Sequence, residues 1–325
     1  MLGLLKHYFD YYLLGGKKRA KSFAAQRAVN QQHRYDYPAE NNGWKKFGER
    51  PVYGDSSMGT IFDPQVLKHE DILLMSVSER KTGNIILLQS NDAIHWQKEC
   101  TLLAPREHSW ESTVNRSCLR YVNGMWHLWY TGQQNNRSAI GHLVAKSYRY
   151  FNRPENNDPV LVPTMPSEGK AVMNPCVLWN EQLKKYQMWY AAGESYEPDR
   201  LYYAESVDGD VWRKRSDAIL EADPIHQWEC KKVGGCDVIR RQDGLYEMYY
   251  IGYQNVDVAR ICHATSVDGI RWSRTDDNLC LSPTSNAWDS DAVYKPSCLM
   301  YKGKKYLWYN GRSGNQEYIG LAVHE

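Results

Sequence analysis

Aromatic strands recur along this chain at a nearly constant interval. The pairs Trp129-Tyr130, Trp189-Tyr190 and Tyr249-Tyr250 follow one another at 60 residues, and Trp308-Tyr309 follows after 59. An internal repeat of this length marks an architecture that is built from similar units. Five such units occupy most of the 325 residues, so no room is left for a second globular domain.

Turn motifs keep the same interval. SVDGDVW at residues 206–212 recurs as SVDGIRW at 266–272, and Trp228-Glu229 recurs as Trp288-Asp289. Short strands joined by Asp-Gly turns, four to a unit, are typical of a propeller blade and not of a helical solenoid. The pattern predicts five blades, the first of which has an aliphatic strand in place of the aromatic one.

The fifth blade is one strand short at its C-terminal end. A segment that starts at Gly43 and includes Trp44 resembles the fourth strand of the other blades. We expect it to pair with the C-terminal strands and close the ring, because closure removes exposed sheet edges. The sequence therefore predicts an all-β fold: a five-bladed β-propeller over residues 43–325, closed by an N-terminal strand, with a short helical and basic arm over residues 1–42.

Composition argues against several classes of protein. The net charge is +2, with +6 in the first 50 residues and −4 in the remainder. One short basic stretch is not a basic face, so nucleic-acid binding is not expected. The eight cysteines form no C-x-x-C pair, so we expect no zinc cluster and no cofactor, and a structural metal ion in the central channel is left open. Cys118, Cys176 and Cys298 fall at near-equivalent positions of different blades, which indicates buried thiols and favours a reducing, cytoplasmic compartment.

The N-terminal arm allows two interpretations. Residues 2–21 combine an apolar stretch, interrupted by charges, with a basic cluster. They are too short to span a bilayer and lack the charge arrangement of a secretion signal. The segment could lie peripherally on the inner membrane surface, or it could dock on the propeller rim or on a second subunit.

Charged residues gather at the start of the first strands, where the blades of a propeller converge. The X-Pro pairs of blades 1, 3 and 5 align Asp63, Arg116, Asn174 and Lys295, and blade 4 contributes Asp237 by our alignment. Buried charges are costly unless they are paired or used. The layer is therefore interpreted either as a polar ligand pocket or as a ring of internal ion pairs that fills the channel.

Further polar residues can reach the same mouth. Those that follow the second strands are Glu79, Arg80, Gln133, Glu194 and Arg312, and those that precede the first strands are Glu111, Glu229, Asp289 and Asp291. We select Arg80, Arg312, Glu111 and Asp291 as substrate-binding candidates, together with Arg116, Asn174 and Lys295. Glu111, Glu229 and Asp289 share the Trp-(Glu/Asp) repeat, and a residue repeated in three blades is more typical of a structural lock than of a catalyst.

These motifs resemble the five-bladed propellers of glycoside hydrolase families 43, 32, 62 and 130. The resemblance covers residues 43–325 and rests on the S-x-D-G-x-x-W turns and the Y-x-M-W-Y-x-G strands. In family 43-like enzymes a catalytic base precedes proline on the first strand of blade 1, which matches Asp63 here. Asn174 and Arg116 stand where a second acidic residue is expected, and Asp237, Glu194 or Glu229 could supply the general acid.

The resemblance implies an enzyme that acts on a glycosidic bond of a carbohydrate. Two carboxyl groups facing each other across a funnel suit an inverting hydrolase with Asp63 as base. Arg116 and Lys295 favour an alternative, because such cations bind phosphate or an acidic sugar. That alternative is a phosphorylase, or a glycosyltransferase of polysaccharide biosynthesis that uses a phosphate-bearing donor. A sugar-binding propeller without catalysis is the third possibility.

Overall fold

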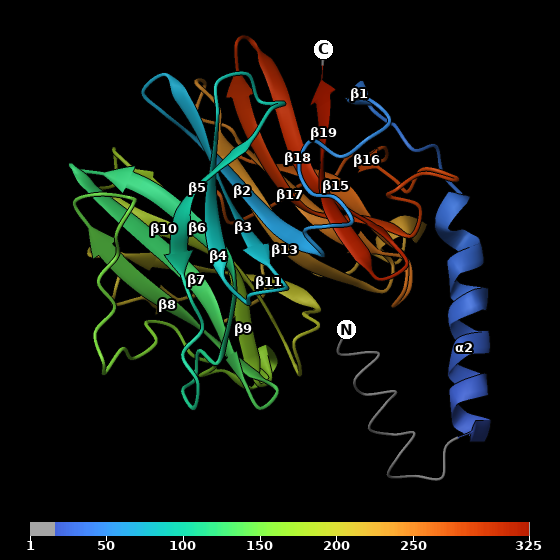
Figure 1. The fold of residues 1–325 in the computed structure, drawn as a ribbon, viewed down its shortest axis with the longest axis horizontal. Coiled ribbons are helices and arrows are strands. Elements are labelled where there is room, and N and C mark those ends of the chain that lie inside the picture. Colours follow the sequence, from blue (N-terminus) through green and yellow to red (C-terminus); the bar gives the residue numbers. More distant parts are fainter. Residues whose placement is uncertain (1–16, 325) are drawn as a thin grey trace.

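The computed structural model describes residues 17–324, whose strands form the five predicted blades (Figure 1). A helix, α2 (Lys17–Gln32), and a 3-10 turn, η1 (His33–Tyr35), precede the first strand. The predicted N-terminal helix is thus confirmed for its described part, whereas residues 2–16 of the proposed membrane-contacting segment lie outside the described residues. Within the described part of the chain, no helix is both long and apolar enough to cross a membrane.

Blades 1, 4 and 5 are four-stranded antiparallel sheets, whereas blades 2 and 3 are joined into one seven-stranded sheet by a single parallel pair, Ser138 with Ala171. Blade 1 consists of β2 (Ile61–His69), β3 (Ile72–Glu79), β4 (Ile85–Ser90) and β5 (Gln97–Leu103). Blade 2 consists of β6 (Thr113–Val122), β7 (Met125–Gln134) and β8 (Arg137–Ala145). Blade 3 consists of β9 (Ala171–Asn180), β10 (Lys185–Gly193), β11 (Arg200–Ser206) and β12 (Arg213–Lys214).

The last two blades complete the ring. Blade 4 consists of β13 (Lys232–Arg240), β14 (Tyr246–Tyr253), β15 (Ala259–Ser266) and β16 (Leu279–Leu281). Blade 5 consists of β17 (Ala292–Tyr301), β18 (Lys304–Ser313), β19 (Gln316–His324) and β1 (Trp44–Lys46). Each first strand contacts the first strand of the next blade, and β17 contacts β2. The five first strands therefore surround a common axis.

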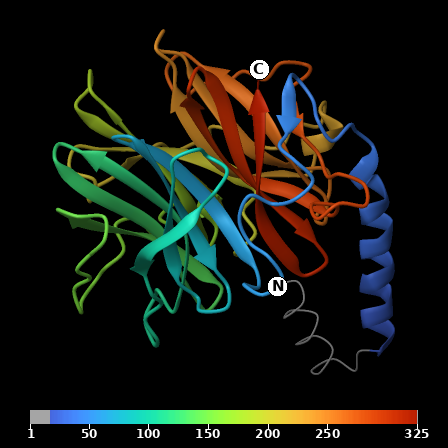
Figure 2. The ribbon, with the colours of Figure 1, turned by 45° about the horizontal axis from the view of Figure 1, so that its top comes forward.

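An N-terminal strand completes the last blade, as the sequence predicts. β1 pairs antiparallel with β19, with Trp44 opposite His324 and Lys46 opposite Ala322, and the two strands lie side by side in Figure 2. The Trp44 side chain is buried and meets Tyr249 of blade 4 edge to face, with ring centroids 5.6 Å apart. Strand pairing and aromatic packing thus both tie the N-terminal segment to the C-terminal part of the ring.

The aromatic strands link neighbouring blades through their tryptophans. In three blades the indole N–H donates to a backbone carbonyl in a turn of the next blade. These hydrogen bonds join Trp129 to Gly209 (3.0 Å), Trp189 to Gly269 (2.7 Å) and Trp308 to Ala93 (3.2 Å). The last of them connects blade 5 back to blade 1, so the repeated Trp serves the closure of the ring.

The Asp-Gly turn is shaped for this contact. The Ser206 hydroxyl accepts the N–H of Gly209 at 2.8 Å, and the Asp208 carboxylate accepts two further backbone N–H groups at 2.9 Å. Gly209 has a φ of 89°, and a Cβ at that position would lie 3.0 Å from the Trp129 ring. Glycine is therefore required both by the backbone conformation and by the close approach of the indole.

A second repeated contact fastens the outer part of each of blades 2 to 5. The tyrosine of the aromatic strand donates its hydroxyl to a buried carboxylate just before the first strand. The pairs are Tyr130 with Glu111 (2.5 Å), Tyr190 with Glu168 (2.8 Å), Tyr250 with Glu229 (2.7 Å) and Tyr309 with Asp289 (3.2 Å). Each carboxylate also meets a cation: Arg153, Lys214, Arg274 and Lys46, respectively.

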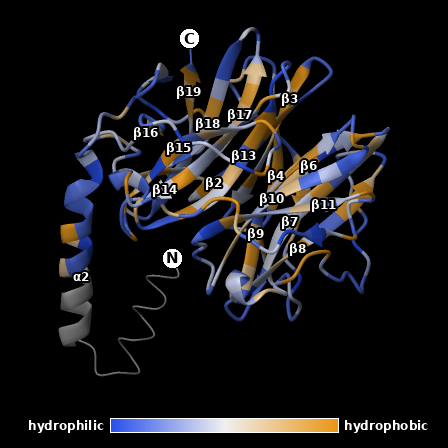
Figure 3. Ribbon diagram, turned by 180° about the vertical axis from the view of Figure 1, so that it is seen from behind, coloured by the Kyte–Doolittle hydropathy of each residue, from blue (hydrophilic) through white to orange (hydrophobic). Residues whose placement is uncertain are grey.

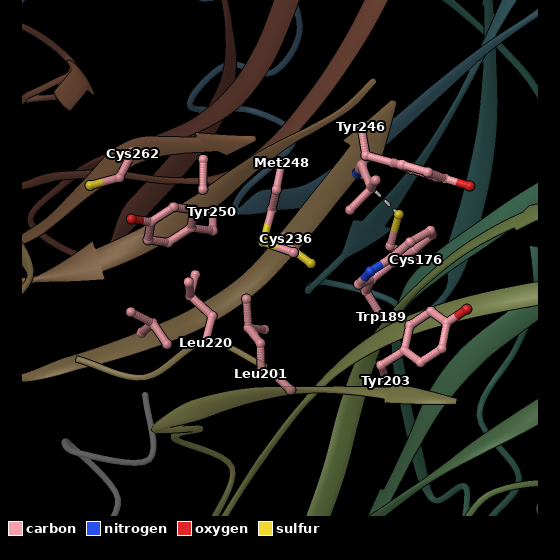
Figure 4. Packing of buried hydrophobic residues seen from close by; sticks show 14 of the residues in the cluster. Cys176, Trp189, Leu201, Tyr203, Leu220, Cys236, Tyr246, Met248, Tyr250 and Cys262 are labelled. Carbon is pink, nitrogen blue, oxygen red and sulfur yellow. Dashed lines mark hydrogen bonds between the residues drawn. The ribbon is translucent and has the colours of Figure 1, made fainter. Parts of the chain in front are cut away.

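Apolar side chains fill the spaces between the blades, and the hydrophobic residues concentrate on the strands (Figure 3). Figure 4 shows the cluster between blades 3 and 4, where Trp189 and Met248 lie near Cys176 and Cys236. The Cys176 thiol accepts the Val238 N–H at 3.2 Å across the two blades. All eight cysteines are free thiols, and those at the equivalent first-strand positions are buried, as expected.

Two histidines of blade 2 form a hydrogen-bonded chain with an aspartate and a tyrosine of blade 3. The Asp210 carboxylate contacts His142 at 2.7 Å, His142 contacts His127 at 3.0 Å, and the Tyr186 hydroxyl contacts the other nitrogen of His127 at 3.2 Å. Burial, together with the neighbouring His142, lowers the pKa of His127 to about 4. His127 therefore stays neutral inside the folded protein at pH values where it would be charged in the unfolded chain.

We expect Trp44→Ala to lower the free energy of unfolding by about 3–5 kcal/mol, because it removes a buried indole from the closing strand. Phe47→Ala, which changes a side chain that is 43% exposed just beyond β1, should cost far less. Urea unfolding of both variants checks this expectation. Equal losses in the two variants would show that the closing strand does not hold the ring.

We expect the protein to lose stability as the pH falls from about 6.5 to about 4. The unfolded chain binds a proton at His127 in this range and the folded protein does not, so acidification favours unfolding. In His127→Gln this contribution is absent, so the loss of unfolding free energy on acidification should be smaller by up to about 3 kcal/mol. Urea unfolding of the wild-type protein and of His127→Gln at pH 7 and pH 5 gives the change in the free energy of unfolding for each. An equal change in both proteins would contradict this expectation.

Candidate functional site

Every first strand changes register near its start. The bulges fall between Phe62 and Gln65, Asn115 and Ser117, Met173 and Cys176, Val233 and Cys236, and Tyr294 and Ser297. In four blades the bulge carries a left-handed residue, with φ values of 61° at Asp63, 38° at Arg116, 57° at Asn174 and 52° at Lys295. Such strained backbone clusters at functional sites, and here it aims four polar side chains towards the middle of the ring.

Blade 4 differs, and here the alignment made from the sequence is wrong. Asp237 pairs directly with Tyr249, as Cys176 pairs with Trp189, so Asp237 lies two residues beyond the position of Asn174. The position equivalent to Asn174 is occupied by Gly235, where a Cβ would lie 2.8 Å from the Asn174 amide. The glycine makes room for its neighbour, so this layer holds four polar side chains and not five.

A cavity of about 390 Å³ opens above this layer. Its lining comes from the ends of the second strands, the bulges and the hairpins that follow. The polar and aromatic lining residues include Phe62, Glu79, Arg80, Asn115, Gln133, Asn174, Tyr196, Glu197, Tyr253, Asp257, Tyr294, Lys295, Arg312 and Glu317. Acidic, basic, amide and aromatic groups in one concave site are typical of a ligand pocket.

Asp63 lies at the floor of the site, on β2. Its side chain is fully buried, and one carboxylate oxygen is 2.5 Å from the Lys295 ammonium, which lines the cavity. The other oxygen accepts the Ser78 hydroxyl at 3.3 Å and the Arg116 N–H at 3.2 Å. A buried carboxylate that is held this way keeps one fixed orientation, one side chain away from the cavity.

Glu317, at the start of β19, is connected to Asp63 through one amide. The Asn310 side chain accepts the Asp63 N–H at 2.9 Å and donates to the Glu317 carboxylate at 2.9 Å. Burial raises the pKa of the neighbouring Tyr294, and the Glu317 carboxylate raises it further, so that phenol keeps its proton. The cavity therefore holds a second oriented carboxyl group whose place relative to Asp63 is set by Asn310.

Three cations share the cavity. Lys295 lies over the Phe62 ring at 4.9 Å, and Arg80 lies over the same ring at 4.5 Å. Arg312 donates to the Asp257 carbonyl at 3.2 Å, while its buried Nε has no hydrogen-bond partner. The predicted substrate-binding residues Lys295, Arg80 and Arg312 thus come together with Asn174.

Arg116 does not line the cavity. Its guanidinium is buried in the central channel, where it donates to the carbonyls of Cys236 and Pro296 at 3.1 Å each. The Arg116 side chain therefore links blades 2, 4 and 5 by hydrogen bonds and fills the space between their first strands. Only its backbone N–H touches the Asp63 carboxylate.

The other predicted site residues lie elsewhere. Asp237 is buried between blades and accepts the Cys298 N–H at 2.7 Å, and Glu111 belongs to the tyrosine contact of blade 2. Glu194 is 72% exposed and lies 3.5 Å from Lys170, outside the cavity lining. Asp291 forms an ion pair with Arg34 of η1 at 2.7 Å.

Sequence reasoning missed Glu317, Glu197 and Asp257, which supply carboxylates to the cavity. Glu317 lies at the start of a third strand, and Glu197 and Asp257 lie in loops between second and third strands, where the repeat marks no position. Asp257 also receives the Asn30 amide of α2 at 2.8 Å, so the N-terminal arm touches a residue of the cavity rim. Within residues 17–324, no three His, Cys, Asp or Glu side chains are grouped so that they could hold a metal ion.

Comparison with known proteins finds a family model that matches part of the chain, two partial relatives and solved structures of similar fold. The model of the glycosyl hydrolases family 32 N-terminal domain matches residues 87–238. The uncharacterized protein MT1551 of Mycobacterium tuberculosis (strain CDC 1551 / Oshkosh) is 31% identical over 149 residues, which cover 43% of this chain and 47% of that protein. The chain thus spans about half the length of the curated relatives it matches.

Two solved structures share the fold over most of their length. A thermostable family-43 glycoside hydrolase superposes with a TM-score of 0.65 at 16% identity, covering 80% of this chain and 88% of its own. A member of family 130, described as a family of mannoside phosphorylases that contains glycoside hydrolases for β-1,2 mannosidic linkages in Candida mannan, gives a TM-score of 0.67 at 13% identity, covering 88% and 95%. With its five blades and its N-terminal closing strand, the chain shares the β-propeller fold of these glycoside hydrolases, and its residues 87–238 match the family 32 model.

Proposed function

We propose that this protein is a carbohydrate-active enzyme that hydrolyses a glycosidic bond with inversion of configuration, in the cavity above Asp63. The observation that carries the proposal is the placement of two acidic residues by one amide, because Asn310 accepts the backbone N–H of Asp63 and donates to the Glu317 carboxylate. Glycoside hydrolysis needs one carboxylate as base and one carboxylic acid to protonate the leaving oxygen. The fold shared with family 43 and family 130 proteins supports a carbohydrate as the substrate.

The two groups take different roles in this proposal. Asp63 forms an ion pair with Lys295, and in this proposal it is the general base that activates water. Glu317 is the general acid, because it lines the cavity directly and can reach a leaving group there. Glu197 is less suited to donate a proton, since its carboxylate is only 2.9 Å from the Lys232 ammonium. An inverting site needs a separation of roughly 6.5–9.5 Å between the two carboxyl groups, so that a water molecule fits between them.

Phenylalanine and tyrosine rings complete a binding surface for sugar. Phe62, Tyr196, Tyr253 and Tyr294 line the cavity together with the amides of Asn115 and Asn174. Burial raises the pKa of Tyr253 and of Tyr294, so both phenols are hydrogen-bond donors at neutral pH. Flat apolar faces beside oriented polar groups match the two kinds of surface that a sugar ring presents.

The position of Lys295 favours a second candidate function. Its ammonium stands between Asp63 and the cavity, and Arg80 and Arg312 line the same cavity. A phosphorylase, or a glycosyltransferase with a phosphate-bearing donor, would use this group of cations to hold phosphate. In that case Asp63 would orient Lys295 and would not activate water.

We expect Asp63→Asn to reduce turnover by ~10²–10⁴-fold, because it removes the proposed base, and to leave the fold intact, because asparagine tolerates a left-handed backbone. Glu317→Gln should lose activity on methyl glycosides and keep much of it on 4-nitrophenyl glycosides, whose leaving group needs no proton. Rates on a panel of such glycosides, with the anomer of the product assigned by NMR, test both roles. Glu194→Gln is the control, since that carboxylate lies outside the cavity. Full activity of Asp63→Asn on every cleaved glycoside would rule out the catalytic proposal.

We expect Lys295→Met to separate the two candidate functions. In a hydrolase of neutral glycans it should alter the rate with no dependence on added phosphate. In a phosphorylase or transferase it should weaken the binding of inorganic phosphate or of a sugar phosphate about tenfold or more, because it removes a charge-assisted contact. Calorimetry of the wild-type protein and the variant with these ligands decides between them. Absence of phosphate binding by the wild-type protein would exclude the second candidate.

A further inference from the structure

A second and larger cavity, of about 790 Å³, lies between blades 2 and 3. It is formed by the tip of the β7–β8 hairpin, the first residues of β8, the segment that leads to β9, and Trp110 before β6. Its lining residues are Trp110, Gln134, Asn135, Arg137, Ser138, Ala139, Pro159, Val162, Pro163, Gly169 and Lys170. None of the functional residues discussed so far belongs to it.

The hairpin tip is rigidly shaped. Gln134 and Arg137 pair across the two strands, and the two residues between them, Asn135 and Asn136, have φ values of 52° and 61°. Two left-handed residues in a two-residue loop form a type I′ turn, which asparagine accommodates better than most residues. The amide of Gln134 and the guanidinium of Arg137 are therefore presented from a preorganised edge of the cavity.

The cavity carries positive charge without matching acid in its lining. Arg137 is exposed, and within the described chain its side chain forms no ion pair or hydrogen bond. Lys170 is 62% exposed, and its nearest carboxylate, at 3.5 Å, is the equally exposed Glu194, which is not part of the lining. The Arg137 guanidinium, the Lys170 ammonium in its exposed ion pair, two amides and the Trp110 ring suit an anionic group on a sugar.

The two cavities lie on either side of one hairpin. Gln133 lines the first cavity and its neighbour Gln134 lines the second. Between them, the Asn136 N–H donates to the Tyr196 hydroxyl at 2.8 Å, and Tyr196 lines the first cavity. The hydrogen bond between Asn136 and Tyr196 therefore marks the boundary between the two neighbouring cavities.

We propose that the second cavity is a binding subsite for an anionic glycan, in which Arg137 and Lys170 hold a carboxylate or a phosphate carried by a sugar unit distant from the reacting bond. The proposal rests on the proposed function only in that the other end of the same glycan occupies the cavity above Asp63. It defines the substrate class as an acidic oligosaccharide. Charge-assisted hydrogen bonds to Arg137 and Lys170 are the recognition chemistry.

Calorimetric titration with three probes tests the subsite. Hexagalacturonate carries carboxylates, phosphorylated mannopentaose carries a phosphate, and maltohexaose is neutral. We expect the protein to bind one of the two anionic probes and not maltohexaose, with an affinity that falls as salt is added. The double variant Arg137→Gln/Lys170→Gln should weaken that binding about tenfold or more. Lys184→Gln/Lys302→Gln, which removes the same charge from exposed positions outside both cavities, should bind like the wild-type protein.

Three outcomes would overturn the inference. They are no detectable binding of either anionic probe at millimolar concentration, equal binding of maltohexaose, and equal weakening by the two double variants. Turnover that persists in Asp63→Asn contradicts the proposed hydrolase alone, whereas unchanged probe binding by Arg137→Gln/Lys170→Gln contradicts the subsite alone.

Discussion

The hydrogen bond from a buried indole to the turn of the next blade is the contact on which the ring depends. A buried N–H without an acceptor costs about 1–3 kcal/mol, and Trp129, Trp189 and Trp308 each find their acceptor only in a neighbouring blade. A blade on its own therefore leaves this donor unsatisfied, and stability arises between units. Where blade 4 has Tyr249 in place of Trp, the contact is replaced by ring packing against Trp44 of the closing strand.

Much of the fold could be predicted because these contacts demand the same residues in every unit. The spacing of Trp and of Asp-Gly follows from one geometry repeated around the axis, and even the closing strand is visible as a displaced copy of a fourth strand. Glu111, Glu229 and Asp289 were identifiable as structural by the same logic. Glu168 has the same tyrosine contact, but a serine precedes it in place of Trp, so the motif does not reveal it.

The site was harder to predict because it is where the units differ. The X-Pro pairs located Asp63, Asn174 and Lys295 correctly, since proline marks the bulge in those three blades. Blade 4 has no such marker, and counting residues from the aromatic strand moved the alignment by two positions, to Asp237. Glu317 and Glu197 lie on hairpins whose course depends on tertiary packing, so no local pattern placed them beside Asp63.

Completion of the last blade by β1 also has a consequence for how the chain is made. During synthesis residues 44–46 leave the ribosome well before their partner strand, Gln316–His324. Until that strand is made, the growing chain holds an unpaired strand and blades whose neighbours are incomplete. Pairing over such a sequence separation is slow, and it exposes strand edges that can associate with other chains. The pairing that closes the finished ring thus delays its closure until β19 has been synthesised.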